Sequence, residues 1–380
     1  MKIIDDIKLD FNDVLIRPRR SNLSSRSEVD TIREFSFPHA SRKLSCSPIM
    51  AANMDTTGSF EMAKCLSKFQ AITCLHKHYT ANQLINFFEN NQNILHLVFC
   101  SIGTSQKDID KIKYVYNQLK ENNKNIPNIC IDIANGYSEN FVNKAYTIRK
   151  MYPEIIIIAG NVVTPEMTEE LILRGGVDIV KIGIGSGSVC TTRLKTGIGY
   201  PQLSAIMECG DAAHGLGGHI CSDGGCVIPA DICKAFGGNA DFVMLGGMLA
   251  GTDCCDGEWE YEWRCKTLGE DETRNKEWWQ PFDPQYPTEK RKVYLKFYGM
   301  SSKEAMSKHD GGVANYRTSE GRCVRIPYKG TTQNIMQDIL GGIRSACTYI
   351  GAKSIKDFSK KTIFIRVNNT HNRIYEKYDK

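Results

Sequence analysis

Eight short hydrophobic runs occur along the chain, and each of them ends in small or polar residues. The runs are nearly continuous and rich in β-branched residues, as in the strands of a parallel sheet that helices cover. They lie at 47–55, 71–78, 95–103, 128–136, 154–162, 178–187, 219–225 and 241–247. Hydrophobic residues at helical spacing occupy the stretches between and after the runs, at 59–69, 81–91, 107–123, 138–152, 165–176, 201–217, 229–238 and 332–352.

This alternation of strands and helices predicts an α/β protein that folds as a (β/α)₈ TIM barrel. A doubly wound sheet is the alternative, but the motif GxGxxG is missing at the end of a first strand. We expect one barrel domain over residues 1–380. The reacting groups of such barrels lie on the loops that follow the strands, so the residues after each run are the candidates for a functional site.

Composition narrows the class of protein. With 41% hydrophobic and 24% charged residues among 380, the chain has the composition of an ordinary globular protein. The net charge of +5 and the lack of a dense Lys/Arg stripe argue against a nucleic-acid-binding protein. No apolar run is long enough for a signal peptide or a membrane span. Fifteen cysteines without a secretory signal indicate a reducing compartment, so we expect a cytoplasmic protein.

The sequence GSGSVC at 185–190 follows the sixth run and places Cys190 in a glycine-rich loop. Glycines let the backbone approach a ligand closely, and its carbonyls could hold a monovalent cation or its amides an anion. Thr192 and Arg193 give Cys190 a polar setting that favours a thiolate, which is a strong nucleophile near neutral pH. The alternative is a flexible surface loop without a chemical role.

Glycines also follow the seventh and eighth runs, as Asp223-Gly224-Gly225 and Gly246-Gly247. Phosphate sites of TIM barrels commonly lie after these two strands, and glycine amides suit them. Because Asp223 would repel phosphate, we expect it to bind a ribose hydroxyl. An Asx-turn that caps the loop is the alternative role for this carboxylate.

The second run ends at His76-Lys77-His78, and the fourth run ends near Asp132. Two histidines at this spacing on a strand point to one side and could bind a metal, but no third ligand suggests itself. Lys77 is the simpler candidate, as a cation for phosphate. Asp132 suits a polar group of ribose or nicotinamide.

A polar segment, GGVANYRTSEG at 311–321, separates the eighth run from the last helix. Long excursions near the active end of a barrel often form lids, and we expect a mobile lid at about 307–330. Glu320 is its candidate proton carrier and Arg317 its candidate anion contact. A solvated loop with surface charges is the alternative.

These segments together resemble the IMP dehydrogenase/GMP reductase family, and its reductase branch in particular. The resemblance runs from about Lys8 to Val367 and rests on AANMDT, HKHY, DIANGYSE, AGNVVT, GSGSVCTTRLKTGIGYPQLSA, SDGGC, FVMLGGMLAG, FYGMSS and GGVANYRTSEG. The paired regulatory insert that IMP dehydrogenases usually carry does not interrupt the second to fourth runs. This absence favours the reductase branch.

The resemblance implies a purine nucleotide interconversion in which GMP and NADPH give IMP, ammonia and NADP. Cys190 would attack the purine carbon that bears the amino group, ammonia would leave a covalent thioimidate, and hydride would then displace the sulfur. Sulfur suits this route because it both adds and leaves easily. Thr192 and Glu320 would form the relay that protonates the amine. An IMP dehydrogenase without the regulatory insert and an inactive nucleotide-binding regulator are the alternatives.

The resemblance also implies the ligand contacts. The nucleotide would meet Asp223, Gly224, Gly225, Gly246, Gly247, Gly299, Met300, Ser301, Arg317, Thr318, Ser319, Glu320 and Gly321. NADPH would meet Ser25, Arg26, Lys77, Asp132, Ile133, Ala134, Ile184 and Gly185. Potassium would be held by Gly185, Gly187, Cys190, Thr192 and Arg193. Ser25 and Arg26 would come from a neighbouring subunit of a homotetramer, and Arg26 would favour NADPH over NADH by pairing with the ribose phosphate.

Two features depart from the family pattern. The cysteine loop usually reads GPGS, and Ser186 in place of proline frees φ at one position. Residues 252–292 form an unusual Trp-rich insertion after the eighth strand, which contains Trp259, Trp263, Trp278 and Trp279. We expect an ordered surface excursion that packs on the barrel or on another subunit, and a partner-binding module is the alternative. A metal site there would need a fourth ligand beside Cys254, Cys255 and Cys265.

Overall fold

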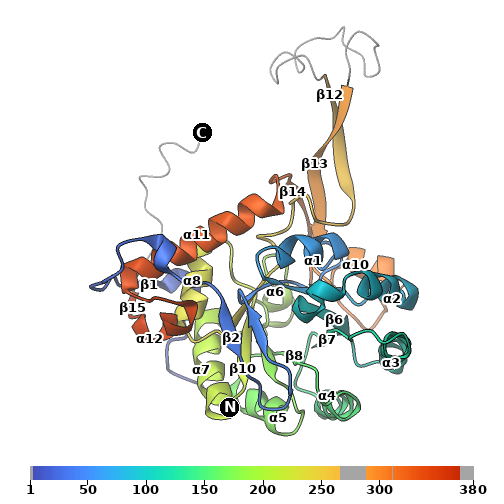
Figure 1. Ribbon diagram of the computed structural model, residues 1–380, viewed down its shortest axis with the longest axis horizontal. Helices are drawn as coiled ribbons and strands as arrows, with labels where there is room; N and C mark the ends of the chain where they lie inside the picture. Colours follow the sequence, from blue (N-terminus) through green and yellow to red (C-terminus); the bar gives the residue numbers. More distant parts are fainter. Residues whose placement is uncertain (1–2, 266–287, 310, 369–380) are drawn as a thin grey trace.

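The computed structural model describes residues 3–265, 288–309 and 311–368, and these residues form a closed barrel of eight parallel strands (Figure 1). Each predicted run contains one barrel strand. The strands are β4 (Ile49–Ala51), β5 (Ile72–Leu75), β6 (Val98–Ile102), β7 (Asn128–Asp132), β8 (Ile157–Val162), β9 (Ile179–Ile182), β10 (His219–Asp223) and β11 (Phe242–Leu245). Strands that are consecutive in the chain are neighbours in the barrel, and β11 pairs with β4 to close it. The predicted (β/α)₈ barrel is confirmed.

Helices surround the barrel, as the hydrophobic spacing predicts (Figure 1). They are α1 (Phe60–Ser67), α2 (Ala81–Asn90), α3 (Gln106–Glu121), α4 (Glu139–Met151), α5 (Pro165–Leu173), α7 (Gln202–Gly215), α8 (Pro229–Gly237) and α11 (Thr332–Ile350). Several begin after a Ser or Thr whose hydroxyl accepts a hydrogen bond from a backbone N–H of the first turn, as at Ser59, Thr80 and Thr331. Such caps pair an amide that the helix itself leaves free.

The apolar core has two layers. The larger layer lies between the strands and the surrounding helices. The smaller layer fills the barrel interior, where Cys74, Cys130 and Cys221 pack beside Phe99 and Phe242 as small apolar residues. Burial raises the pKa of the Cys221 thiol well above its ordinary value, so this cysteine is a poor nucleophile.

Additional elements complete the barrel at its ends. The hairpin of β2 (Arg33–Phe35) and β3 (Leu44–Cys46) closes the end where the barrel strands begin, and Phe35 stacks on Phe242 with ring centroids 4.2 Å apart. Near the two chain ends, β1 (Val14–Ile16) pairs with β15 (Phe364–Arg366). The shorter helices are α6 (Thr192–Thr196), α10 (Lys303–His309) and α12 (Phe358–Lys361), with 3₁₀ turns at Phe11–Asp13, Arg26–Glu28, Gln92–Leu97 and Ile355–Asp357.

A three-stranded antiparallel sheet of β12 (Trp259–Cys265), β13 (Thr288–Tyr298) and β14 (Cys323–Pro327) projects from the barrel as an arm (Figure 1). β12 and the start of β13 lie within the predicted insertion. Trp259 packs edge to face on Tyr328 with centroids 5.9 Å apart, and its Nε1 donates to the Cys255 carbonyl at 3.2 Å. Trp278, Trp279 and the side chain of Cys265 lie outside the described residues.

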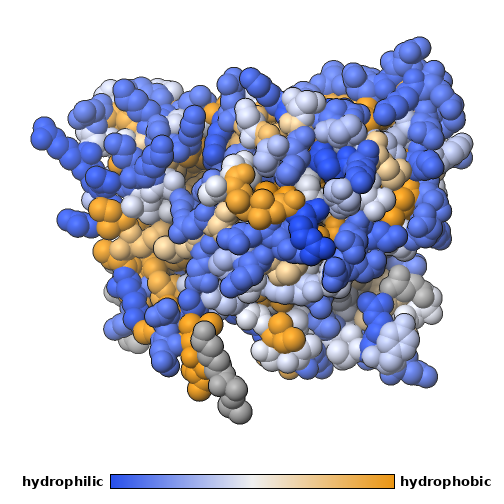
Figure 2. Space-filling view, turned by 90° about the horizontal axis from the view of Figure 1, so that it is seen from below, coloured by the Kyte–Doolittle hydropathy of each residue, from blue (hydrophilic) through white to orange (hydrophobic). Residues whose placement is uncertain are grey.

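The surface is mixed in character. Figure 2 shows one face on which hydrophilic side chains predominate and hydrophobic ones form separate patches. Single exposed apolar side chains, such as Leu173 and Leu194, are normal on a folded chain. Within the described ranges, no helix combines the length and the apolar character that crossing a membrane requires.

Candidate active site

A cavity of about 460 Å³ lies at the carboxyl ends of the barrel strands, where TIM barrels carry their reacting groups. Its lining residues are Ala52, Asn53, Met54, Lys77, Asp132, Ile133, Ala134, Asn161, Lys181, Gly183, Ile184, Gly185, Gly187, Val189, Cys190, Thr192, Asp223, Gly299, Met300, Ser301, Arg317 and Glu320. Most of the side chains and glycines that the sequence singled out therefore surround one space.

Cys190, Thr192 and Glu320 form a chain of contacts in this cavity. Oγ1 of Thr192 lies 3.2 Å from Sγ of Cys190 and donates to Oε2 of Glu320 at 2.7 Å. The first two residues stand in the loop after β9 and the first turn of α6, whereas Glu320 lies 128 positions further along the chain. The fold thus joins the three predicted catalytic residues in the order sulfur, hydroxyl, carboxylate.

Backbone contacts fix this end of the predicted lid on the cysteine loop. The N–H of Thr191 donates to the Glu320 carbonyl at 2.8 Å, and Cys190 forms an antiparallel bridge with Gly321. Glu320 is half-buried, whereas Tyr316 in the middle of the lid is 89% exposed. This segment therefore lies against the cysteine loop at Glu320, whereas Tyr316 lies in solvent.

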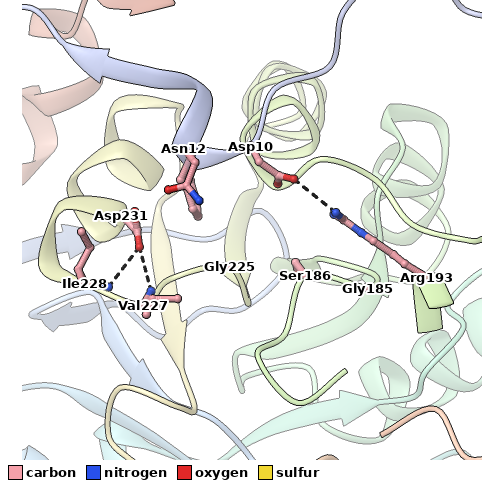
Figure 3. Close-up of a pocket in the computed structure, with 10 residues that line it drawn as sticks. Asp10, Asn12, Gly185, Ser186, Arg193, Gly225, Val227, Ile228 and Asp231 are labelled. Atoms are coloured by element: carbon pink, nitrogen blue, oxygen red, sulfur yellow. Dashed lines mark hydrogen bonds and ion pairs between the residues drawn. The ribbon is translucent and has the colours of Figure 1, made fainter. Parts of the chain in front are cut away.

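Arg193 packs against the cysteine loop from outside the cavity. Gly185 has φ +78°, and a Cβ there would lie only 2.6 Å from Cγ of Arg193, so glycine lets the arginine pass. The guanidinium donates to the Tyr200 carbonyl at 2.6 Å and pairs with Asp10 at 3.4 Å (Figure 3). Unlike the other residues predicted to hold potassium, Arg193 does not line the cavity.

Ser186 forms a side-chain hydrogen bond that a proline at this position could not form. Its hydroxyl donates to the Asp223 carbonyl at 3.1 Å. Gly224, with φ +94°, lies so close that a Cβ there would come 2.5 Å from Oγ of Ser186. This hydrogen bond ties the cysteine loop to the end of β10 and offsets the freedom that the loss of proline gives the backbone.

The structure places only some of the predicted glycines on the wall of a cavity. Gly225 lines a second hollow of about 420 Å³ on the other side of the cysteine loop, beside Asn12 and Val227 (Figure 3). At Gly247 a Cβ would lie 2.8 Å from Oγ of Ser188, so this glycine permits close packing on the cysteine loop. Gly224, Gly246, Thr318, Ser319 and Gly321 are not among the lining residues of the larger cavity.

Two carboxylates share one buried cation at the floor of the cavity. Nζ of Lys181 lies 2.5 Å from Oδ1 of Asp132 and 2.9 Å from Oδ2 of Asp223. Burial opposes the charge of Lys181, but the carboxylates outweigh it and hold its pKa well above the ordinary value. Burial also opposes the charge of Asp132, and Lys181 outweighs it, so the pKa of this carboxyl is lowered.

Sequence reasoning missed Lys181 and Asn161, which both line the cavity. Asn161 donates from Nδ2 to Oδ2 of Asp223 at 2.9 Å. Lys181 interrupts the hydrophobic run IVKIGI, and a charged residue inside a buried strand needs a partner. That interruption is the signal that could have identified it.

The histidines of HKHY are packed and neutral. Burial lowers the pKa of His76 to about 3 and that of His78 to about 4. His78 stacks on His309 with ring centroids 3.5 Å apart. Lys77 alone among these three residues of the motif lines the cavity, and its role as a contact for phosphate stays a prediction.

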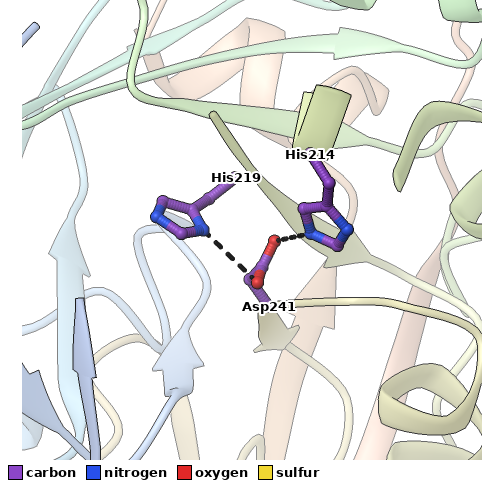
Figure 4. Close-up of side chains that lie close together, drawn as sticks. All are labelled: His214, His219 and Asp241. Atoms are coloured by element: carbon purple, nitrogen blue, oxygen red, sulfur yellow. Dashed lines mark hydrogen bonds and ion pairs between the residues drawn. The ribbon is translucent and has the colours of Figure 1, made fainter. Parts of the chain in front are cut away.

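In the part of the chain that the structure describes, one group of three potential metal ligands converges, namely His214, His219 and Asp241 (Figure 4). It lies where β10 and β11 begin, at the end of the barrel opposite the cavity. The buried Asp241 accepts from Nε2 of His214 at 2.7 Å, from Arg33 at 2.7 Å and from the N–H of Ile220 at 3.0 Å. A carboxylate with these donors and a guanidinium beside it is a structural anchor rather than a metal ligand.

Ser25 and Arg26 lie apart from the cavity within one chain. They border a separate hollow of about 520 Å³ together with Thr348 and Tyr349. The side chain of Ser25 accepts a hydrogen bond from the N–H of Ser27 and so caps the 3₁₀ turn. A contact of these two residues with a cofactor in the cavity would require a second chain.

Comparison with known proteins agrees with this geometry. The family model described as "IMP dehydrogenase / GMP reductase domain" matches residues 8–267 and 285–376. The chain is 51% identical over 376 residues to proteins named GMP reductase from Yersinia pestis (strain Pestoides F) and Klebsiella pneumoniae subsp. pneumoniae, with 99% of each chain covered. Residues 268–284 fall between the two matched stretches. The chain belongs to the IMP dehydrogenase/GMP reductase family.

Proposed function

We propose that the chain is an oxidoreductase, an NADPH-dependent GMP reductase that converts GMP to IMP and ammonia. The observation that carries the proposal is the contact chain from Cys190 through Thr192 to Glu320 in a cavity that Asp132 and Asp223 also line. The relatives that the chain resembles over nearly its whole length bear the name of this activity.

The order of the hydrogen bonds gives each residue a role. Because Thr192 donates its proton to Glu320, its oxygen can only accept from the Cys190 thiol. The thiol proton can therefore pass through Thr192 to Glu320, and the thiolate attacks the purine carbon that bears the amino group. Glu320 returns that proton to the amine, the C–N bond breaks, and ammonia carries the proton away.

The sulfur of Cys190 then remains bonded to the purine carbon as a thioimidate. A reduced nicotinamide held by Lys77 and Asp132 would supply hydride to that carbon. The C–S bond breaks, its electron pair returns to Cys190, and IMP leaves. The Glu320 end of the lid holds the carboxylate near the sulfur through Thr192.

The nucleotide would be held by carboxylate and backbone groups around the sulfur. Asp223 would take the ribose, and the phosphate would meet the glycines after β10 and β11 with Gly299, Met300 and Ser301. The lid residues 317–321 would cover it. Gly299 packs directly on the cysteine loop, because a Cβ there would lie 2.9 Å from the Val189 carbonyl.

The cofactor would lie along Lys77, Asp132, Ile133, Ala134 and Ile184, all of which line the cavity. Ser25 and Arg26 would reach its adenosine end from the neighbouring subunit of a homotetramer, and Arg26 would select NADPH by pairing with the ribose phosphate. Light scattering should give four chains per particle. An active monomer would contradict this arrangement.

Potassium would bind the backbone carbonyls of the cysteine loop, at Gly185, Gly187 and Cys190, with Thr192 and Arg193 at the rim. All five positions except Arg193 line the cavity, and in the turn at 187–190 the Cys190 N–H already bonds to the Gly187 carbonyl at 3.0 Å. A monovalent cation there would stiffen the loop that carries the nucleophile. Activity should therefore fall when sodium or lithium replaces potassium.

One absorbance assay tests the activity against its alternatives. The purified protein is mixed with GMP and NADPH, or with IMP and NAD, and the reduced nicotinamide is followed. Loss of NADPH with GMP supports the proposal. Formation of NADH with IMP would instead indicate an IMP dehydrogenase, and no change in either mixture would indicate a nucleotide-binding regulator.

The cysteines that the structure describes are free thiols. This is consistent with our expectation that the protein is cytoplasmic.

A further inference from the structure

Lys181 sits between two site carboxylates that come from different strands. It belongs to β9, Asp132 to β7 and Asp223 to β10. Its side chain is 3% exposed, and its nitrogen lies within 2.9 Å of an oxygen of each carboxylate. One nitrogen therefore fixes the positions of both acids.

The contacts of Asp223 leave one of its oxygens open. Lys181 and Asn161 both donate to Oδ2, and Nδ2 of Asn161 also donates to the Gly183 carbonyl at 2.7 Å. No donor in the described ranges is found for Oδ1, in a side chain that is 22% exposed and lines the cavity. The protein holds one oxygen and presents the other to a ligand.

The ionisation of Asp132 and Asp223 depends on the positive charge of Lys181. Two carboxylates that face one another across a single nitrogen repel, and one of them would take up a proton if the cation were removed. With Lys181 present, its positive charge lowers the pKa of the Asp132 carboxyl and offsets the repulsion between the two acids. The cation thus supports the ribose acceptor at Asp223 and the cofactor contact at Asp132 together.

We propose that Lys181 is a positioning residue that sets the nucleotide carboxylate Asp223 and the cofactor carboxylate Asp132 as one unit. The inference rests on the proposed function, in which Asp223 binds ribose and Asp132 binds the nicotinamide cofactor. In this arrangement Lys181 contacts neither the purine carbon nor the sulfur of Cys190. Its removal should alter the affinity for GMP through the charge of the carboxylates.

The test measures GMP binding by calorimetry on a Cys190→Ala background, so that no covalent bond forms. Each affinity is divided by that of the Cys190→Ala protein with Lys181 intact at the same pH, so that the ionisation of the GMP phosphate cancels. On this relative scale the Lys181→Met variant should bind GMP more weakly as pH falls, by about tenfold per pH unit below the new ionisation of the carboxylate pair.

A second substitution separates charge from packing. Adding Asp132→Asn to Lys181→Met removes one charge of each sign and leaves Asp223 as the single acid. GMP should then bind more tightly than to the Lys181→Met variant, and the pH dependence should disappear. A purely structural role for Lys181 would make the double variant weaker still.

A matched control is available in Lys234→Met. Lys234 is also buried, and its nitrogen donates to the Phe11 carbonyl at 2.8 Å, outside the cavity. This variant should lose stability but keep a flat pH profile for GMP binding.

The outcomes are distinct. If GMP binds when Lys181 is intact and the Lys181→Met variant keeps the same affinity at each pH, the positioning role is overturned and the proposed function stands. If GMP fails to bind with Lys181 intact, the proposed function is overturned and this inference with it. If Lys181→Met does not fold, the double variant decides: flat, near-normal GMP affinity supports the role, and lost affinity overturns it.

Discussion

The two ends of the barrel each carry a carboxylate among cations, yet the two carboxylates differ in how completely the protein satisfies them. Asp241, at the end where the strands begin, is 1% exposed and accepts hydrogen bonds at both oxygens from His214, Arg33 and Ile220. Asp223, where the strands end, receives both side-chain donors at one oxygen. A satisfied carboxylate stabilises the fold, whereas one with a free oxygen at a cavity can bind a ligand.

The same contrast separates the cysteines. Cys221 packs in the barrel interior with a raised pKa, whereas Cys190 faces a cavity and contacts a hydroxyl that leads to a carboxylate. Residue type alone does not distinguish the two thiols. Their surroundings make Cys221 a core residue and Cys190 the candidate nucleophile.

The largest expected effect concerns Cys190. Cys190→Ala removes the nucleophile, so kcat should fall by roughly 10⁴-fold or more, while GMP still binds because the other contacts remain. The loss of NADPH absorbance gives kcat, and calorimetry gives the affinity for GMP. Cys221→Ala is the control and should keep its turnover. Measurable turnover of Cys190→Ala near the normal rate would contradict the covalent route.

The Glu320→Gln variant should show the next largest loss of kcat. The amide cannot take the thiol proton, so kcat should drop by roughly 10²- to 10⁴-fold with a small change in GMP affinity. Single-turnover kinetics with NADPH in excess would report the loss directly. Thr192→Val should lower the rate similarly, because the hydroxyl lies between the sulfur and the carboxylate. A normal rate for either variant would remove the relay from the account.

At the opposite end of the barrel, Asp241→Asn should affect stability instead. It removes the buried counter-charge of the half-buried Arg33 and the exposed His214, so the free energy of unfolding should fall by roughly 1–3 kcal/mol. Urea denaturation measures the change. The specific activity of the folded variant should stay normal, and a selective loss of kcat would mean that the two ends of the barrel are not separate.

The smallest effect should come from His214. Its hydrogen bond to Asp241 is the main cause that raises its pKa above the ordinary 6.5. The stability it contributes is therefore complete below that value and is lost as pH rises through the raised pKa. The difference in unfolding free energy between the parent and His214→Ala should shrink from acidic to alkaline pH. A difference that grows with pH would contradict the pairing.

Much of the barrel could be predicted from the sequence because each strand is a local hydrophobic run and each helix a local repeat. Cys190 and Asp223 were identifiable because glycines mark the loops that carry them. Lys181 was missed because its partners lie on β7 and β10, and only the folded sheet brings these strands near β9. The pairing of β1 with β15 was missed for the same reason, since these strands are three residues long and lie at opposite ends of the chain.

The hairpin of β12 and β13 shows another limit of sequence patterns. Charged and aromatic residues alternate in β12, whereas β13 has the four charged residues 289–292 near its start, so neither strand is a continuous hydrophobic run like those of the barrel. Lys292 lies 4.3 Å from the centroid of the Trp259 ring, a contact across the two strands that gives no signal within either segment alone. The sequence could identify an aromatic insertion there, but its antiparallel pairing followed only from the structure.

A crystal structure of the protein with GMP tests the central claim most directly. The account predicts the purine carbon that bears the amino group within bonding distance of Sγ of Cys190, and a ribose hydroxyl on the free oxygen of Asp223. A base bound far from Cys190, or a ribose that does not meet Asp223, would contradict it.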